Sequence, residues 1–225
     1  MEFDFSPYFK RYEVLAQAAD KVFERLCKEY PDCVTCEVGC SDCCHALFDL
    51  TLIESLYINQ HFKALFQGKL RADLQEAANS ADRKIAKIKR EAFRRLQNGE
   101  DENTILADLA TCRVRCPLLN EEDQCDMYAY RPLTCRFYGV PTAIDGKGHT
   151  CGRSGFVQGT EYPTVNLDTV YQQLQQISSE LLRDMRASHI KLVDLLIPVS
   201  MALITLFDDE YFGIEYPQPD TAGKK

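Results

Sequence analysis

The chain has 225 residues, with 26 Lys and Arg against 34 Asp and Glu, so its formal net charge is −8. This charge argues against nucleic acid or an anionic membrane as the main partner. The eleven cysteines are fewer than the roughly 8–10% of residues that marks a small disulfide scaffold. The length suits one hydrophobic core, so we expect a single α-rich domain over residues 1–225.

The first predicted helix occupies most of residues 6–30. Ser6 and Pro7 are typical of a helix start, as a capping hydroxyl followed by Pro at the first helical position, and Pro31 lies just past the end. Apolar residues recur at helical spacing, which predicts the buried face of this helix. They are Val14, Leu15, Ala18, Val22 and Leu26, and Cys27 lies on the same stripe as a small core residue.

Three more helices are expected before residue 112. The first covers 50–66, with Asp49 or Thr51 as its cap and Gly68 as its stop. The second covers 69–98, and a short one covers 101–109. The 69–98 segment carries the clearest amphipathic stripe in the chain. Its members are Leu70, Leu74, Ala77, Ala81, Ile85, Ile88, Ala92 and Leu96.

Residues 112–163 are rich in Pro, Gly and Cys and show little apolar periodicity, which predicts loop. Within it we expect one turn of helix at 127–130 and a short strand near 136–140. Helical periodicity returns over 166–188 and 190–207, with a bend at Pro198, and the tail from Tyr216 is expected to fray. The predicted architecture is therefore a cysteine-rich core, 36–151, between flanking helices at 6–30 and 166–207.

The apolar stretch 192–207 is too short for a membrane span, because a spanning helix needs about 20 predominantly apolar residues. The N-terminal sequence MEFDFSPYF also lacks the basic and apolar regions of a secretory signal peptide. We therefore expect a cytoplasmic protein without a membrane partner. In a reducing compartment, a cysteine set of this size indicates a metal site rather than disulfides.

Two groups of cysteines have spacings that suit metal ligation. The first is Cys36-x3-Cys40-x2-Cys43-Cys44, and the second runs from Cys112 and Cys116 through Cys125 and Cys135 to Cys151. Structural zinc sites favour closely spaced Cys pairs, whereas iron–sulfur clusters accept looser spacing and often have Pro after a ligand, as in Cys116-Pro117. The pattern slightly favours an iron–sulfur cluster of the four-iron type, and zinc is the alternative. Adjacent Cys43 and Cys44 are expected to serve different metals, or one of them to be a spectator.

The cysteine pattern resembles the YkgJ-type cysteine-cluster family, a zinc- or iron-chelating domain with a CxxCxxCC opening. The resemblance rests on that opening, although x3 follows Cys36 here where many members have x2, and on the later segment C-x2-Y-x2-R-P-x2-C-R at 125–136. It covers residues 36–151 and implies eight metal ligands. They are Cys36, Cys40, Cys43, Cys44, Cys116, Cys125, Cys135 and Cys151. Flagellin lysine methylases carry a similar cluster, which is the one link to an enzyme activity.

Tyr128, Arg131 and Arg136 match the same family pattern and are candidates for contact with the cofactor. A guanidinium can donate to cluster sulfurs and tune them, and we favour this role over substrate binding. For six further Cys and His residues we favour a structural role over metal ligation. They are Cys33, Cys112, His45, His149, His61 and His189. The basic run at 83–95 is interleaved with acids and is predicted to be a solvated helix face.

The sequence thus favours a metal-binding protein with a role in redox chemistry, metal handling or sensing. Its partner is a metal ion, and no protein partner is indicated. One alternative is a cluster-dependent modifying enzyme that uses S-adenosylmethionine, as the methylase resemblance implies. Another is a module in which zinc only stabilises the fold of a partner-binding surface.

Overall fold

The computed structural model describes residues 3–37 and 39–214 and is mainly helical, as the sequence predicts. The α-helices are α1 (Ser6–Glu29), α2 (Leu52–Leu65), α3 (Gly68–Gln97), α4 (Glu102–Thr111), α5 (Leu133–Phe137), α6 (Leu167–Asp184), α7 (Val199–Ile204) and α8 (Asp209–Phe212). Short 3-10 turns lie at η1 (Asp42–Cys44), η2 (Tyr128–Tyr130) and η3 (Ile190–Asp194). None of the described helices combines the length and hydropathy needed to cross a membrane.

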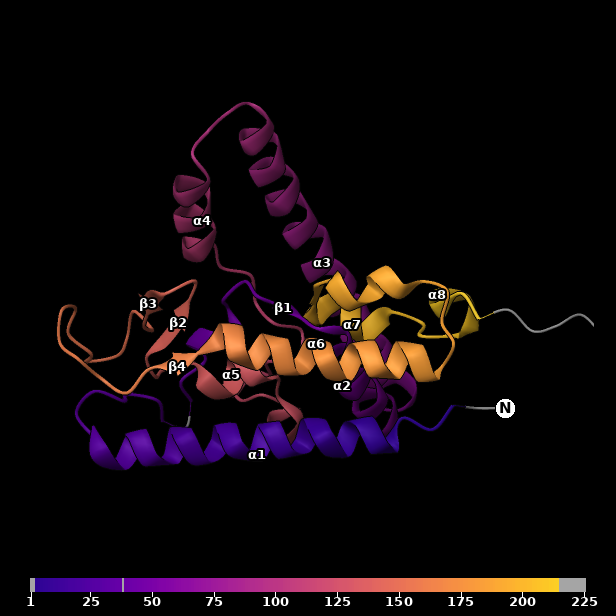
Figure 1. Cartoon of the computed structure of the whole chain (residues 1–225), viewed down its shortest axis with the longest axis horizontal. Coiled ribbons are helices and arrows are strands. Elements are labelled where there is room, and N and C mark those ends of the chain that lie inside the picture. The colour runs from indigo at the N-terminus through magenta and orange to yellow at the C-terminus, as the bar shows by residue number, and fades with distance from the viewer. Residues whose placement is uncertain (1–2, 38, 215–225) are drawn as a thin grey trace, which may run out of the picture.

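The strands are short, and their pairing holds separate segments of the chain together. Strand β1 (Asp49–Leu50) pairs antiparallel with β5 (Ile197–Pro198). Strand β2 (Thr142–Ile144) pairs antiparallel with β3 (Lys147–His149) and parallel with β4 (Val165–Asn166). The β2–β3 hairpin stands beside the cysteine-rich loops, and β4 leads directly into α6 (Figure 1).

Helices α1, α2 and α6 form the body of the molecule and pack against one another, with α5 against α1 (Figure 1). Helix α1 begins at Ser6 as predicted, but its N-cap is Phe5, and the Ser6 N–H donates to the Asp4 carboxylate over 2.9 Å. The predicted stripe is partly wrong, because Val14 is 63% exposed. The core face instead carries Tyr8, Phe9, Tyr12, Ala16, Ala19 and Leu26, so two tyrosines belong to the buried face.

Helix α2 begins with a capping box. Thr51 is one of the two predicted caps, and its side chain accepts from the N–H of Glu54, the third residue of the helix. The Glu54 carboxylate in turn accepts from the Thr51 N–H over 3.1 Å. The helix is buried on most of its surface, which explains its weak amphipathic pattern. Asn59 donates to the carbonyls of Ala202 and Thr205 over 2.7 and 3.2 Å, which ties α2 to the end of α7.

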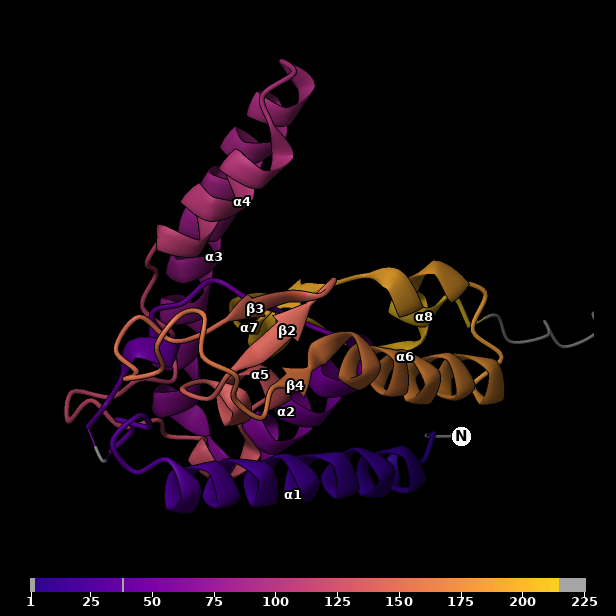
Figure 2. The ribbon, with the colours of Figure 1, turned by 60° about the vertical axis from the view of Figure 1, so that its left-hand side comes forward.

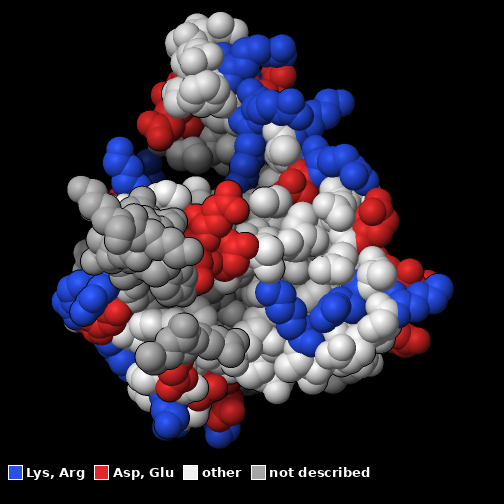
Figure 3. All heavy atoms as spheres, turned by 90° about the vertical axis from the view of Figure 1, so that its right-hand side faces the viewer, with Lys and Arg blue, Asp and Glu red and all other residues white. Residues whose placement is uncertain are grey.

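Helices α3 and α4 form a hairpin, here called the arm, that projects away from the body (Figures 1 and 2). Within α3, all of which the structure describes, Ala78 and Ala81 are the buried residues. The predicted stripe is therefore largely uncovered toward the tip, where Leu96 is 47% exposed and nearby Phe93 is 61% exposed. Lys and Arg side chains gather on the α3 side of the arm (Figure 3). The basic run is thus an exposed helix face, as predicted.

Two local predictions are wrong. Residues 190–207 do not form one bent helix: Ile197 and Pro198 are strand β5, which separates η3 from α7. Proline lacks the N–H that a continuing helix needs, so the chain starts a new helix at Val199. Residues 136–140 are not a strand either, because Arg136 and Phe137 belong to α5. The tail from Tyr216 lies outside the described residues.

Candidate metal centre

The structure brings the eight predicted ligands together as two neighbouring sets. Cys36, Cys40 and Cys151 form the outer set, and their thiols interact electrostatically with one another. The inner set lies next to it, and Cys43 interacts with every other thiol in it. Its members are Cys43, Cys44, Cys116, Cys125 and Cys135.

Hydrogen bonds between distant loops assemble the outer set. The Gly155 N–H donates to the Cys33 carbonyl over 2.8 Å, and the Thr35 hydroxyl donates to the Arg153 carbonyl over 2.8 Å. These bonds hold the loop before Cys36 against the loop that follows Cys151. Gly139 has a φ of +99°, and a Cβ at that position would lie 2.4 Å from the Cys36 sulfur. Only glycine therefore lets Cys36 approach the chain after α5 this closely.

A backbone hydrogen bond, a short antiparallel pairing and helix α5 bring the inner set together. The Cys116 N–H donates to the Cys44 carbonyl over 2.7 Å, which joins the first cysteine loop to the second. A tight turn then pairs Leu119 with Cys125, so Cys125 returns beside Cys116. Cys135 comes from the buried helix α5.

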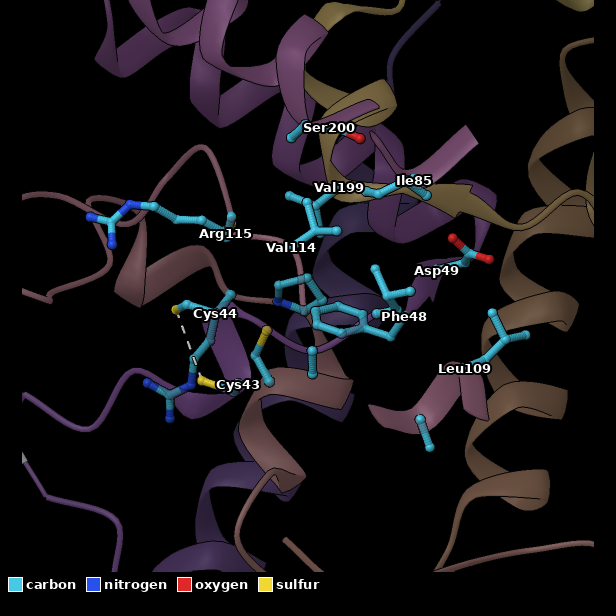
Figure 4. Close-up of a pocket in the computed structure, with 18 of the residues that line it drawn as sticks. Cys43, Cys44, Phe48, Asp49, Ile85, Leu109, Val114, Arg115, Val199 and Ser200 are labelled. Atoms are coloured by element: carbon cyan, nitrogen blue, oxygen red, sulfur yellow. Dashed lines mark hydrogen bonds between the residues drawn. The ribbon is translucent and has the colours of Figure 1, made fainter. Parts of the chain in front are cut away.

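The sulfurs of the adjacent Cys43 and Cys44 lie 4.0 Å apart (Figure 4). Two thiolates at about 2.3 Å from one tetrahedral zinc ion would be about 3.8 Å apart, so this pair can share an ion. Within the described part of the chain, however, no group of three or more Cys, His, Asp or Glu side chains already surrounds one point closely enough to hold a metal. A metal held by the inner set would therefore require the remaining sulfurs to move inward.

Burial keeps most of the thiols protonated when no metal is bound. It raises the pKa of Cys116 to about 12 and that of Cys36 to about 12, and it raises the pKa of Cys135 well above its usual value. Cys43 is the exception: the hydrogen bond from the Cys44 thiol, helped by the nearby Arg131 guanidinium, lowers its pKa to about 7. Cys43 is therefore the thiol most ready to act as a thiolate at neutral pH.

Arg131 and Arg136 share one carboxylate, Asp20 on α1, and Arg131 bonds it over 3.2 Å. The Arg131 guanidinium lies over the Tyr128 ring, 3.9 Å from its centroid, and Tyr128 itself is 64% exposed. Arg136 is buried and donates to the carbonyls of Arg131 and Ala129 over 2.9 and 2.8 Å. Arg131 thus faces the thiols, whereas Arg136 fixes the backbone that carries Arg131.

Buried Glu54 holds the start of α5 in place. Its carboxylate accepts from the Leu133 N–H over 3.0 Å and from the Thr51 N–H and hydroxyl over 3.1 and 2.9 Å. Burial raises the pKa of Glu54, and these three donors oppose that rise. Because Cys135 lies two residues after Leu133, the position of this thiol depends on the Glu54 carboxylate.

Replacing Glu54 by Ala is therefore expected to destabilise the protein by about 2–4 kcal/mol, since it leaves buried N–H groups without an acceptor. Glu54→Gln keeps one acceptor oxygen and should lose less. The check is urea unfolding of both variants beside Glu24→Ala, which removes an exposed carboxylate from α1. Equal midpoints for Glu54→Ala and Glu24→Ala would refute this role.

The inner set opens onto a cavity of about 770 Å³. All five of its cysteines line this cavity, together with Arg131 and apolar side chains such as Phe48 and Val114 (Figure 4). The other walls come from α3, α4 and the β2–β3 hairpin. The thiols are consequently reachable from a large, partly open space.

The other candidates lie around this centre. Cys112 follows α4 and donates to the Asp108 carbonyl, Cys33 accepts the bond from Gly155, and His45 bonds the Ser41 carbonyl over 3.0 Å. His149 lines the cavity, His61 stacks on Tyr130, and His189 bonds the Tyr211 carbonyl.

The sequence reasoning missed three acids: Asp20, Glu54 and Asp42. Asp42 accepts from the Tyr138 hydroxyl over 2.8 Å and from the Cys151 thiol over 3.5 Å. Its place between Cys40 and Cys43 was the available signal. Nothing in the sequence around Asp20 or Glu54 links those acids to the cysteines.

A family model described as "putative zinc- or iron-chelating domain", with the signature CxxCxxCC, matches residues 32–152. This match spans 121 of the 225 residues, more than half of the chain. The chain belongs to the CxxCxxCC family. No match to a curated protein or to a solved structure was found.

Membership of the CxxCxxCC family supports metal binding by this chain, as zinc or as iron. The matched range contains both the outer and the inner set, together with Tyr128 of η2, Arg136 of α5 and Arg131 between these two elements. Helix α1, which supplies Asp20, lies before the match, and α6 lies after it. The family segment therefore covers the thiols but not the carboxylate that anchors both arginines.

Proposed function

We propose that the protein is a cytoplasmic metal-binding protein with its centre at the inner set. The observation that carries this proposal is the convergence of five cysteines, from three separate segments, on one wall of one cavity. A core needs no such collection of thiols, and thiolates are strong ligands for zinc and iron. The single-domain arrangement, with the cysteine core 36–151 between flanking helices, is part of the same proposal.

An iron–sulfur cluster is our first choice for the metal. The ligands would be four of the inner cysteines, with Arg131 beside them to offset thiolate charge and so raise the reduction potential. The ligands come from widely spaced positions, which a cluster accepts more readily than the paired spacing of zinc sites. A bound cluster would supply one-electron chemistry, suited to a redox or sensing role. The outer set, Cys36, Cys40 and Cys151, is proposed as a second and less buried set of ligands.

Anaerobic purification with a count of metal and acid-labile sulfide tests this choice. Iron with an equal amount of sulfide is the expected result. Zinc without sulfide would assign the site to zinc and remove the redox role. A metal-free protein that binds neither zinc nor iron on titration would contradict the proposal as a whole.

A modifying enzyme that uses S-adenosylmethionine is the second candidate, and the cavity favours it. Catalysis at a metal needs an open position and room for a substrate, and a volume of about 770 Å³ next to the thiols offers room. Calorimetric titration of S-adenosylmethionine into the metal-loaded protein should then show saturable binding. A flat titration would leave metal binding in place and remove this enzyme function.

The remaining alternative is zinc that only stabilises a partner-binding fold. In that case Cys40→Ser should unfold the protein, because a structural zinc site supplies folding free energy directly. A melting curve like that of the unchanged protein would exclude this reading.

A further inference from the structure

The cavity beside the inner set has the construction of a ligand pocket rather than a packing defect. Its volume of about 770 Å³ lies within the roughly 300–1,000 Å³ of small-molecule sites. Its walls are mainly apolar, and they come from the arm, from α2 and from α7. The apolar residues include Phe48, Ile58, Ile85, Leu106, Leu109, Val114 and Val199. An empty space lined in this way favours an apolar occupant.

Two lysines of the lining each form a hydrogen bond with a residue of another wall. Lys89 of α3 donates to the Asp49 carboxylate over 2.6 and 2.7 Å, so its charge is neutralised. Lys147 of β3 donates to the side-chain oxygen of Asn103 on α4 over 2.8 Å. Both lysines line the cavity and join two of its walls.

Lys147 keeps an uncompensated charge. Its amide partner is neutral, and among the described residues it forms no ion pair, although Asp145 of the same hairpin also lines the cavity. The other three lining bases are paired, Lys89 with Asp49, Arg115 with Asp123 and Arg131 with Asp20. Lys147 is therefore the lining base that is available to pair with an anionic group of a ligand.

The lining runs from exposed to buried residues. Lys147 is exposed, whereas Phe48 is half-buried and Val114 is buried. Phe48, Val114 and the Cys43–Cys44 pair line the same space (Figure 4). An occupant whose anionic group pairs with Lys147 would therefore place its apolar part against these less exposed residues. A small inorganic anion would leave this apolar wall uncovered.

We propose that this cavity binds an amphipathic small molecule with a long apolar body and one carboxylate, of the fatty-acid class, whose carboxylate pairs with Lys147. This inference goes beyond the proposed metal function, because it depends on the walls of the cavity and not on which metal the inner set holds. It also assigns the arm a role, since α3 and α4 supply one side of the pocket.

The test is a fluorescence titration of the purified full chain, as isolated, with cis-parinaric acid and with the corresponding alcohol. The acid should bind saturably at one site per chain, and the alcohol should bind at least about tenfold more weakly, the equivalent of about 1.4 kcal/mol for one charge-assisted contact. Lys147→Gln should weaken binding of the acid to the affinity measured for the alcohol. Lys69→Gln, which changes an exposed lysine at the start of α3 outside the cavity, should bind like the unchanged protein.

Ala107→Trp tests the location independently, because Ala107 is exposed on α4 and lines the cavity. An indole there should fill the pocket and abolish binding, whereas Val14→Trp on the exposed face of α1 should not. Equal binding of acid and alcohol, or no effect of Lys147→Gln, would overturn the carboxylate assignment. Full binding by a folded Ala107→Trp variant would overturn the site, and no binding to the unchanged protein would overturn both. Metal content, counted in the same samples, reports separately on the metal proposal.

Discussion

Replacing Cys43 by Ser is expected to weaken metal binding by at least about 100-fold. Cys43 interacts with all four other thiols of the inner set, and it is the one whose pKa is lowered, to about 7. Loss of residues that merely orient metal ligands costs about 10–100-fold in affinity, so loss of a central ligand should cost more. The measurement is competition for the metal against a chelator of known affinity.

Cys27→Ser is the matched control for this variant. Cys27 is a half-buried thiol on α1 that belongs to neither set. It interacts electrostatically with Cys36 of the outer set but with none of the inner thiols in the interactions of the described residues, so its replacement should leave the metal at the inner set unchanged. Metal retention by Cys43→Ser at the level of Cys27→Ser would place the metal elsewhere. If the metal is held by the outer set instead, Cys151→Ser and not Cys43→Ser should release it.

Replacing Arg136 by Met is expected to lower the free energy of unfolding by about 3–5 kcal/mol. Arg136 is 6% exposed, and its guanidinium contacts Asp20 and two backbone carbonyls. Removing one partner of a buried ion pair leaves the other charge uncompensated, which carries a cost of this size. Urea unfolding monitored by circular dichroism measures the change.

Arg183→Met is a suitable comparison, because Arg183 is an exposed arginine paired only with the neighbouring Asp184 among the interactions of the described residues. It should change the free energy of unfolding by less than about 0.5 kcal/mol. The double variant Arg136→Met with Asp20→Asn should lose less free energy of unfolding than the sum of the losses of the two single variants, since both changes act on one ion pair. A loss below about 1 kcal/mol for Arg136→Met, which is the size of a single neutral hydrogen bond, would contradict the anchoring role.

The helices were predictable where local signals agreed with packing. Pro7 and Pro31 bracket α1, Thr51 and Glu54 form the capping box of α2, and Gly99 follows α3. The sequence predicted less well which side of each helix is buried. On α1 the buried side includes Tyr12 and Tyr8, whose hydroxyl donates to the Asp184 carboxylate over 2.6 Å. Apolar periodicity alone does not include such residues.

The cysteine spacing predicted which residues carry the chemistry, but not how they group. The two sets mix the first and second sequence groups, because long-range backbone bonds bring Cys116 to Cys44 and residues 153–155 to residues 33–35. Such pairings join segments that are far apart in the chain and have no local signature. The proximity of Cys36 to the chain after α5 likewise depends on Gly139, whose left-handed conformation only the folded chain reveals.

The most direct test of the metal centre is X-ray absorption spectroscopy at the edge of the bound metal. The account predicts a first shell of sulfur alone, at about 2.3 Å, whether the metal is zinc or the iron of a cluster. The same shell should persist in Cys27→Ser and disappear in Cys43→Ser. A first shell dominated by nitrogen or oxygen at about 2.0–2.1 Å would contradict a thiolate centre and would move the metal to His, Asp or Glu side chains.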